Sequence, residues 1–190
     1  MTRMLRAALA AAALSTTAAA SAEAQSGKGL FVGIQYAGAS VNVKDAADDL
    51  EFGSGFGVHA GLGLSARWSV LGNFDRSVLT GNSADVRLTQ YDALLRLQLI
   101  GAASPVKLFV TGGATARSAN AGRDFEGIAP TGGGGVQLFL SSGLAVHGTA
   151  LWTFGNLTRA NQLSGNTIDQ QLKSTGTRVQ AGASLYLFGR

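Results

Sequence analysis

Apolar and polar side chains alternate along this chain in segments of about ten residues, and no other feature constrains its fold so strongly. Residues 91–99 read YDALLRLQL, with Tyr91, Ala93, Leu95, Leu97 and Leu99 on one face and Asp92, Leu94, Arg96 and Gln98 on the other. Because successive side chains of a strand point to opposite faces, this pattern predicts a strand with one apolar face. Comparable segments cover residues 29–43, 55–65, 67–79, 87–100, 105–116, 129–140, 143–157 and 172–188. We therefore expect eight strands.

The connections between these segments alternate in length. Short ones, at 65–67, 101–105 and 141–143, alternate with long ones, at 44–53, 80–86, 117–127 and 158–171. This alternation is typical of an up-and-down meander with every long connection at one end. After residue 25 no sustained helical period or long apolar run occurs, which excludes membrane-spanning helices. The predicted fold is all-β, an eight-stranded antiparallel up-and-down β-barrel.

The first 24 residues read as a leader rather than as part of the fold. Arg3 and Arg6 give a basic start, an Ala-rich run follows, and Ala22-Glu23-Ala24 has the small-x-small pattern of a cleavage site. We expect residues 1–24 to be a cleaved secretory signal peptide. An uncleaved anchor is the alternative. Residues 25–190 would then form the barrel, without disulfides, because the chain has no cysteine.

The composition indicates that much of the surface does not face water. Charged residues make up 14% of the chain, against roughly 25% in ordinary soluble domains. The pI near 9.9 arises from few charges of either sign, and no Lys/Arg cluster occurs. Nucleic-acid binding is therefore not expected.

The charged side chains suggest which face of each strand is wet. A Lys or Arg facing lipid at mid-bilayer costs about 2–4 kcal/mol, so Arg96 is expected inside the barrel and Leu95 outside. The same rule predicts an interior polar network with a structural role, made of His59, Asp75, Asp92, Arg96, Lys107, His147 and Arg178. Asp92 and Arg96 lie about 13 Å apart along the strand, so we expect each to pair across the lumen or with a neighbouring strand. Arg76 falls on the lipid face, where it is tolerable only near the interface.

Aromatic residues fall into two groups, as expected for two membrane interfaces. Towards the long connections lie Tyr36, Phe56, Phe74, Tyr91, Trp152 and Phe154. Towards the short connections lie Phe31, Trp68, Phe109, Phe139, Tyr186 and Phe188, although parity places Phe109 and Phe139 inside. We interpret the apolar face as lipid-facing, which makes the chain a transmembrane β-barrel. The alternative is a secreted soluble barrel of lipocalin type, which would need a charged exterior.

The segments GLFVGIQYAG, GFGVHAGLGLSARWSV and QAGASLYLF complete this pattern. With them, residues 26–190 resemble the small eight-stranded outer-membrane barrels of the OmpA/OmpX type. The resemblance implies a place in the outer membrane of a Gram-negative bacterium, in contact with lipid and lipopolysaccharide. It also implies a structural or surface-interaction role, in envelope integrity, adhesion or as a surface antigen, with four external loops that could contact an extracellular ligand.

The closing segment is similar to the signal that the barrel-assembly machinery reads, with Gly182, Tyr186 and Phe188 at matching spacing. It differs because two residues, Gly189 and Arg190, follow the last aromatic residue. In an unbroken strand the side chains of Arg178 and Tyr186, eight residues apart, lie on the same face, so an inward Arg178 and an outward Tyr186 are incompatible. We expect a β-bulge to reconcile the two.

Catalysis, a cofactor and a metal site are not expected. His59 and His147 could join Asp75 or Asp92 in a hydrolytic arrangement. However, His147-Gly148-Thr149 lacks the serine of the His-x-Ser found in lipid A deacylases of this size. Two histidines on different strands without cysteine make a poor metal site, and the acidic stretch 45–51 is expected to be a solvated loop. Because the interior of an eight-stranded barrel has room only for side chains, a wide diffusion pore is not expected. The alternative to the structural role is a narrow porin-like channel, and a lipid-modifying enzyme ranks after it.

Overall fold

The computed structural model describes residues 28–43, 50–80, 85–100, 104–120, 124–159, 162–163, 166–167 and 170–187. The expected signal peptide, the side chains of the acidic stretch 45–51 and Phe188 lie outside these described residues. No helix in the described part is long and apolar enough to cross a membrane.

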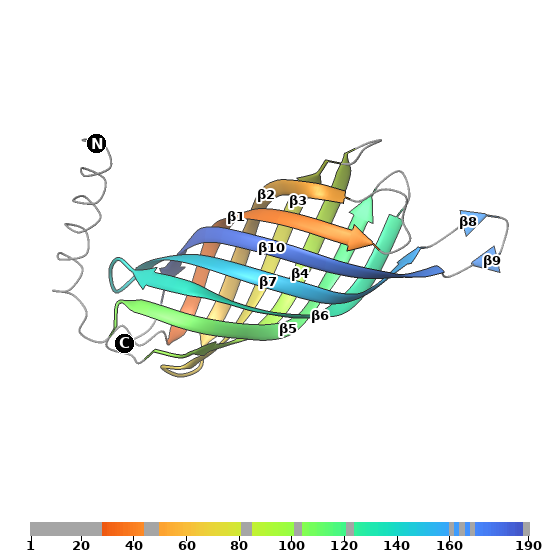
Figure 1. The fold of residues 1–190 in the computed structure, drawn as a ribbon. Helices are drawn as coiled ribbons and strands as arrows, with labels where there is room; N and C mark the ends of the chain where they lie inside the picture. Colours follow the sequence, from red (N-terminus) through yellow and green to blue (C-terminus); the bar gives the residue numbers. More distant parts are fainter. Residues whose placement is uncertain are drawn as a thin grey trace, which may run out of the picture.

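Eight long antiparallel strands close into one barrel (Figure 1), as the alternating sequence predicted. They are β1 (Gly29–Val43), β2 (Leu50–Gly63), β3 (Trp68–Leu79), β4 (Val86–Gln98), β5 (Val106–Asn120), β6 (Asp124–Phe139), β7 (Leu144–Arg159) and β10 (Gln170–Tyr186). Each pairs with its sequence neighbours, and β1 pairs with β10 to close the sheet. Two short strands, β8 (Gln162–Leu163) and β9 (Asn166–Thr167), pair with each other beyond the end of the barrel (Figure 1).

The strands extend further towards the long connections than the sequence pattern suggested. β2 begins at Leu50 rather than near 55, β5 reaches Asn120 rather than 116, and β6 begins at Asp124 rather than 129. At this end small and polar residues such as Ser54 and Ser118 occupy the outer face, so the apolar alternation fades. The backbone ladder nevertheless continues, because its hydrogen bonds do not depend on side-chain polarity.

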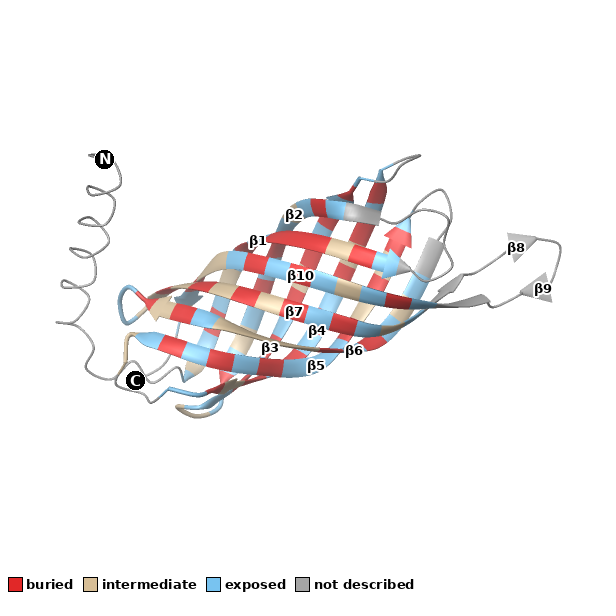
Figure 2. Ribbon diagram, viewed as in Figure 1, coloured by how far each residue is buried: buried red, intermediate tan, exposed pale blue. Residues whose placement is uncertain are grey.

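Buried residues alternate with more exposed ones along most of each of the eight barrel strands (Figure 2). The large exposed apolar side chains, Ile34, Phe56, Val58 and Leu95 among them, point outward from the wall. The buried set is rich in Asn, Gln, Ser, Thr and charged residues, which point into the lumen. This distribution is the reverse of a soluble barrel, in which the apolar face forms the core.

Aromatic residues at the short-connection end correct one expectation. Phe31, Phe109 and Phe139 are buried and Tyr186 is half-buried, all on the lumen face. Of the described residues expected in this belt, Trp68 is the one on the outer wall. Placing Phe31 and Tyr186 at a lipid interface was therefore wrong. They fill the end of the lumen instead, where a ring removes more apolar surface from water than an aliphatic side chain.

The last strand corrects a second expectation. Its register with β1 runs without a break from Ser174 to Tyr186, and its register with β7 is equally continuous. No bulge separates Arg178 from Tyr186, so both side chains face the lumen. The conflict arose from assigning Tyr186 to the lipid face, and it disappears once the phenol points inward.

Candidate functional site

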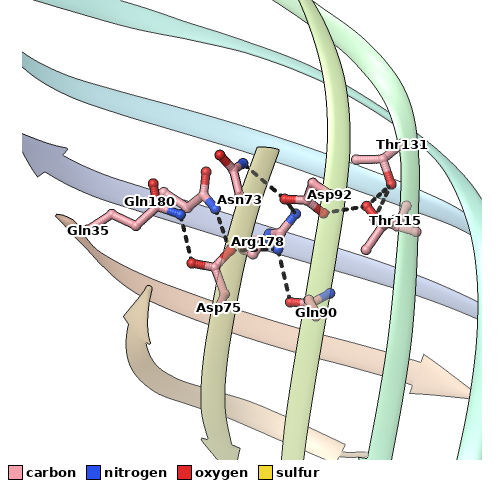
Figure 3. Close-up of polar contacts among 10 residues, drawn as sticks. Gln35, Asn73, Asp75, Gln90, Asp92, Thr115, Thr131, Arg178 and Gln180 are labelled. Carbon is pink, nitrogen blue, oxygen red and sulfur yellow. Dashed lines mark hydrogen bonds and ion pairs between the residues drawn. The ribbon is translucent and has the colours of Figure 1, made fainter. Parts of the chain in front are cut away.

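A cluster of three charged side chains, one arginine and two aspartates, occupies the middle of the lumen (Figure 3). Arg178 on β10 donates from Nη1 to Asp75 Oδ2 at 2.7 Å and from Nη2 to Asp92 Oδ2 at 2.6 Å. Asp75 lies on β3 and Asp92 on β4, across the barrel from β10. One guanidinium thus ties together strands that do not neighbour it in the sheet. Planar guanidinium groups suit this task because their donors form a rigid fork.

Amides and a hydroxyl add hydrogen bonds to both carboxylates: Gln35 and Thr115 bind the Oδ1 atoms, while Gln180 and Asn73 share the Oδ2 atoms with Arg178. Asp75 accepts hydrogen bonds from Gln35 and Gln180, both at 2.7 Å. Asp92 accepts from Asn73 at 3.0 Å and from Thr115 at 2.6 Å. Figure 3 shows these side chains converging on the two carboxylates. Buried charges are tolerated when they are paired and hydrogen-bonded in this way.

Hydroxyl groups extend the network around the wall. Thr115 Oγ1 lies 2.6 Å from Thr131 Oγ1, which lies 2.9 Å from Thr153 Oγ1. With these contacts the network draws side chains from every barrel strand except β2. That strand contributes Gly57, where an added Cβ would collide with the Asp75 carboxylate. The network therefore extends across one cross-section of the barrel, with side chains from seven of its eight long strands.

The two histidines form a separate group. Their ring centroids lie 4.9 Å apart in an edge-to-face arrangement, and His59 Nε2 lies 2.8 Å from Ser184 Oγ. The structure does not bring Asp75 or Asp92 to either ring, since both carboxylates bind Arg178. Among the described residues, the Nδ1 atoms of both rings have no hydrogen-bond partner, and no three metal-ligating side chains gather. Sequence reasoning missed Ser184, whose closeness to His59 depends on barrel closure.

Arg96 and Lys107 lie against aromatic rings. The Arg96 guanidinium carbon is 4.1 Å from the centroid of the Phe109 ring. The Lys107 ammonium is 5.2 Å from the centroid of Phe139. A desolvated cation over a ring face is stabilised by the ring quadrupole. For Arg96 this contact replaces the expected ion pair, since no carboxylate of the described residues forms one with it.

Two further layers fill the ends of the lumen. At the short-connection end, Tyr186 packs against Phe31 and Phe139, with centroids 5.2 Å apart in each pair, and its hydroxyl accepts from Gln137 at 2.8 Å. At the long-connection end an apolar cluster faces inward, made of Ala39, Val41, Leu79, Val86, Leu88 and Ala119. The sequence analysis overlooked this cluster, although alternation places Leu88 on the same face as Asp92 and Arg96.

The aromatic residues expected at the long-connection interface lie on the outer wall. Tyr36, Phe56, Tyr91, Trp152 and Phe154 are exposed and Phe74 is half-exposed. Two pairs form across neighbouring strands, Tyr36 with Phe56 at 5.5 Å and Phe74 with Tyr91 at 5.1 Å between centroids. Aromatic side chains are enriched at membrane–water interfaces, so their position on the outer wall fits an interface at this end of the barrel.

A family profile described as "Outer membrane protein beta-barrel domain" matches residues 7–187. This chain belongs to the outer membrane protein beta-barrel domain family. Membership places the barrel in the outer membrane, and the outward face of this barrel is the apolar one. The resemblance noted from the sequence is confirmed at the level of this family.

Solved structures share the fold of this family member at low sequence identity. Neisserial surface protein A (NspA) is 15% identical, with a TM-score of 0.66, over 84% of this chain and 98% of that one. The outer membrane protein OprG from Pseudomonas aeruginosa is 10% identical, with a TM-score of 0.60, over 88% and 100%. The outer membrane protein AlkL is 13% identical, with a TM-score of 0.63, over 88% and 95%. No curated protein sequence matches this chain.

Proposed function

We propose that this barrel is a structural and surface-interaction protein whose lumen is closed and whose activity lies at its outer wall and external connections. Exported by its signal peptide and inserted by the barrel-assembly machinery, it contributes to envelope integrity, adhesion or surface antigenicity. The single observation that supports this best is the Arg178–Asp75–Asp92 network in the middle of the lumen. Because its members bind one another at hydrogen-bond distance, solute passage would have to break a buried ion pair.

The two clusters that fill the ends of the lumen add to this argument. A passing ion would meet the ring cluster of Phe31, Phe139 and Tyr186 at one end and the cluster around Leu79 and Leu88 at the other. Apolar constrictions resist ion passage because they exclude water. Three unlike barriers in series favour a closed barrel over the narrow porin-like channel.

Planar-bilayer recording tests the closed lumen. Purified, refolded barrel is expected to give no stable channels, whereas a general diffusion porin added as a positive control gives discrete steps. Stable, reproducible steps from the barrel alone would establish the channel function instead. Lipid A analysis of cells carrying His147→Ala addresses the enzyme alternative, since loss of a lipid A modification in that variant would contradict the proposal.

Replacement of the external connections tests the surface role. Residues 160–169 form the longest of them, and a short Gly-Ser segment in their place leaves the eight barrel strands intact. We expect reduced adhesion to cultured epithelial cells or increased detergent sensitivity of the bacteria. A faster unboiled than boiled band on a gel shows that the barrel still folds. If all four connections can be replaced in this way without either effect, the surface role is wrong.

A further inference from the structure

A polar pocket of about 350 Å³ opens at the long-connection end of the barrel. It lies over β1, β10 and β7 and is lined by Asn42, Gly155, Asn156, Lys173, Ser174 and Thr175. Lys173 is paired with Asn156, and Thr175 is paired with both Asn42 and Phe154. The pocket thus belongs to three neighbouring strands rather than to a single loop.

Four of these residues, Asn42, Asn156, Lys173 and Thr175, are exposed and alternate with lumen-facing residues, so they point to the outer wall. They supply an ammonium, two carboxamides and a hydroxyl. Lys173 forms no ion pair with a carboxylate of the described residues. The exposed Glu126 is on β6, on the far side of β7 from β10. The outer lip of the pocket is therefore a site with one cation and several hydrogen-bond donors.

The position of this pocket relative to the apolar wall limits what can bind there. Along β10 and the residue after it, outward side chains are apolar from Leu187 back to Val179 and polar from Thr177 back to Lys173. Eight residues of strand rise about 26 Å, which at a tilt near 40° spans about 20 Å of the membrane normal. The change from apolar to polar therefore falls where acyl chains end and headgroups begin. Trp152 and Phe154 mark the same level on β7.

We propose that this pocket binds the phosphorylated sugar headgroup of an outer-leaflet glycolipid, the chemistry that lipid A presents. The Lys173 ammonium neutralises the phosphate, and the two carboxamides and Thr175 hydrogen-bond to phosphate or sugar oxygens. Charge-assisted hydrogen bonds of this kind are the strong ones. The acyl chains of the same molecule lie along the apolar wall beside Phe154 and Val179. The inference goes beyond the proposed function, because it holds whether or not the lumen conducts.

Binding of purified lipid A to the full folded barrel in non-ionic detergent tests the site. Lys173→Gln is expected to weaken binding about fivefold to tenfold, because one charge-assisted contact is lost. Lys173→Arg should bind as tightly as the unaltered protein. Arg67→Gln is the matched control, since Arg67 is an exposed cation in the connection between β2 and β3, at the opposite end. It should leave the affinity unchanged.

The ligands form the second arm of the experiment. Dephosphorylated lipid A should bind the unaltered barrel as weakly as lipid A binds Lys173→Gln. Inorganic phosphate should compete only at far higher concentration, because it lacks acyl chains. Equal losses for Lys173→Gln and Arg67→Gln would show non-specific charge attraction and overturn the site. Competition by inorganic phosphate at lipid A concentrations would show a simple anion site and overturn the glycolipid assignment. A band shift between boiled and unboiled samples confirms that each variant is folded.

Discussion

Arg178 and Asp92 are 86 positions apart in the chain, yet the guanidinium Nη2 donates to the carboxylate Oδ2 at 2.6 Å. The contact exists only when the barrel is closed, because β10 and β4 meet across the lumen and not along the sheet. Asp75 completes the arrangement on the other terminal nitrogen of the same guanidinium. This pair of carboxylates around one cation therefore reports directly on barrel closure.

Removing the cation should destabilise the barrel more than removing the whole ion pair. Arg178→Met leaves Asp75 and Asp92 buried without a counter-ion, and breaking a buried pair in this way costs about 3–5 kcal/mol. The triple variant Arg178→Met/Asp75→Asn/Asp92→Asn should recover most of that loss, because all three charges of the network are removed together. Urea unfolding in lipid vesicles, followed by fluorescence of the two tryptophans, measures both. Equal stability of the single variant and the unaltered protein would contradict a structural role for the network.

Gly57 should tolerate no side chain, although it lies in a strand. An added Cβ would collide with the Asp75 carboxylate and the Phe74 carbonyl oxygen, so Gly57→Ala should cost about 1–3 kcal/mol through overpacking. Gly148→Ala is the matched control, since a Cβ there meets nothing within 4 Å. The two variants are compared by the temperature to which a sample must be heated before its faster-migrating, folded band disappears from the gel. A lower temperature for Gly148→Ala than for Gly57→Ala would refute this packing.

Tyr186 should matter both as a ring and as a hydrogen-bond acceptor. Tyr186→Phe keeps the packing against Phe31 and Phe139 but leaves the buried Gln137 amide without its partner, which costs about 1–3 kcal/mol. Tyr186→Ala also removes the ring, for a total of about 3–5 kcal/mol. Urea unfolding in vesicles gives both values. Leu185→Ala, one residue away on the outer wall, should cost less than Tyr186→Ala. The reverse order would mean that Tyr186 faces lipid after all.

Strand number, order and facing could be predicted from the sequence because they rest on local rules. A period of two fixes which side chains share a face, and the cost of a charge in lipid fixes which face is inside. Asp75, Asp92, Arg96, Lys107 and Arg178 all follow these rules and lie in the lumen. The strand ends deviate most at the long-connection end, where the outer face leaves the apolar region, and by about two residues at the short-connection end of β2, β4 and β10.

Partners inside the lumen could not be predicted in the same way. Whether Arg96 meets a carboxylate or the Phe109 ring depends on the stagger of strands around the barrel, which no local pattern encodes. The inward direction of Phe31 and Tyr186 was missed because aromatic residues near a strand end were assumed to mark an interface. Phe31 lies an even number of residues from Gln35, and Tyr186 an even number from Arg178. This spacing correctly places both rings on the lumen face. For this barrel, parity was a better guide than residue type.

A new charge on the outer wall should be costly at mid-membrane and harmless at its rim. Leu95 and Ser54 both point outward and are exposed, but Leu95 lies in the apolar band and Ser54 lies beyond Phe56 at the long-connection end. Leu95→Arg should destabilise the barrel by about 2–4 kcal/mol, and Ser54→Arg by about 0–1 kcal/mol, because the cost depends on depth. Urea unfolding in vesicles measures the two values. Because both variants add the same side chain to the same face, any intrinsic effect of arginine on a strand cancels in their difference. Equal values would mean that lipid does not cover the wall at Leu95. The assignment of the apolar face of each strand to lipid, which rests on the cost of a charge in lipid, would then be unsupported.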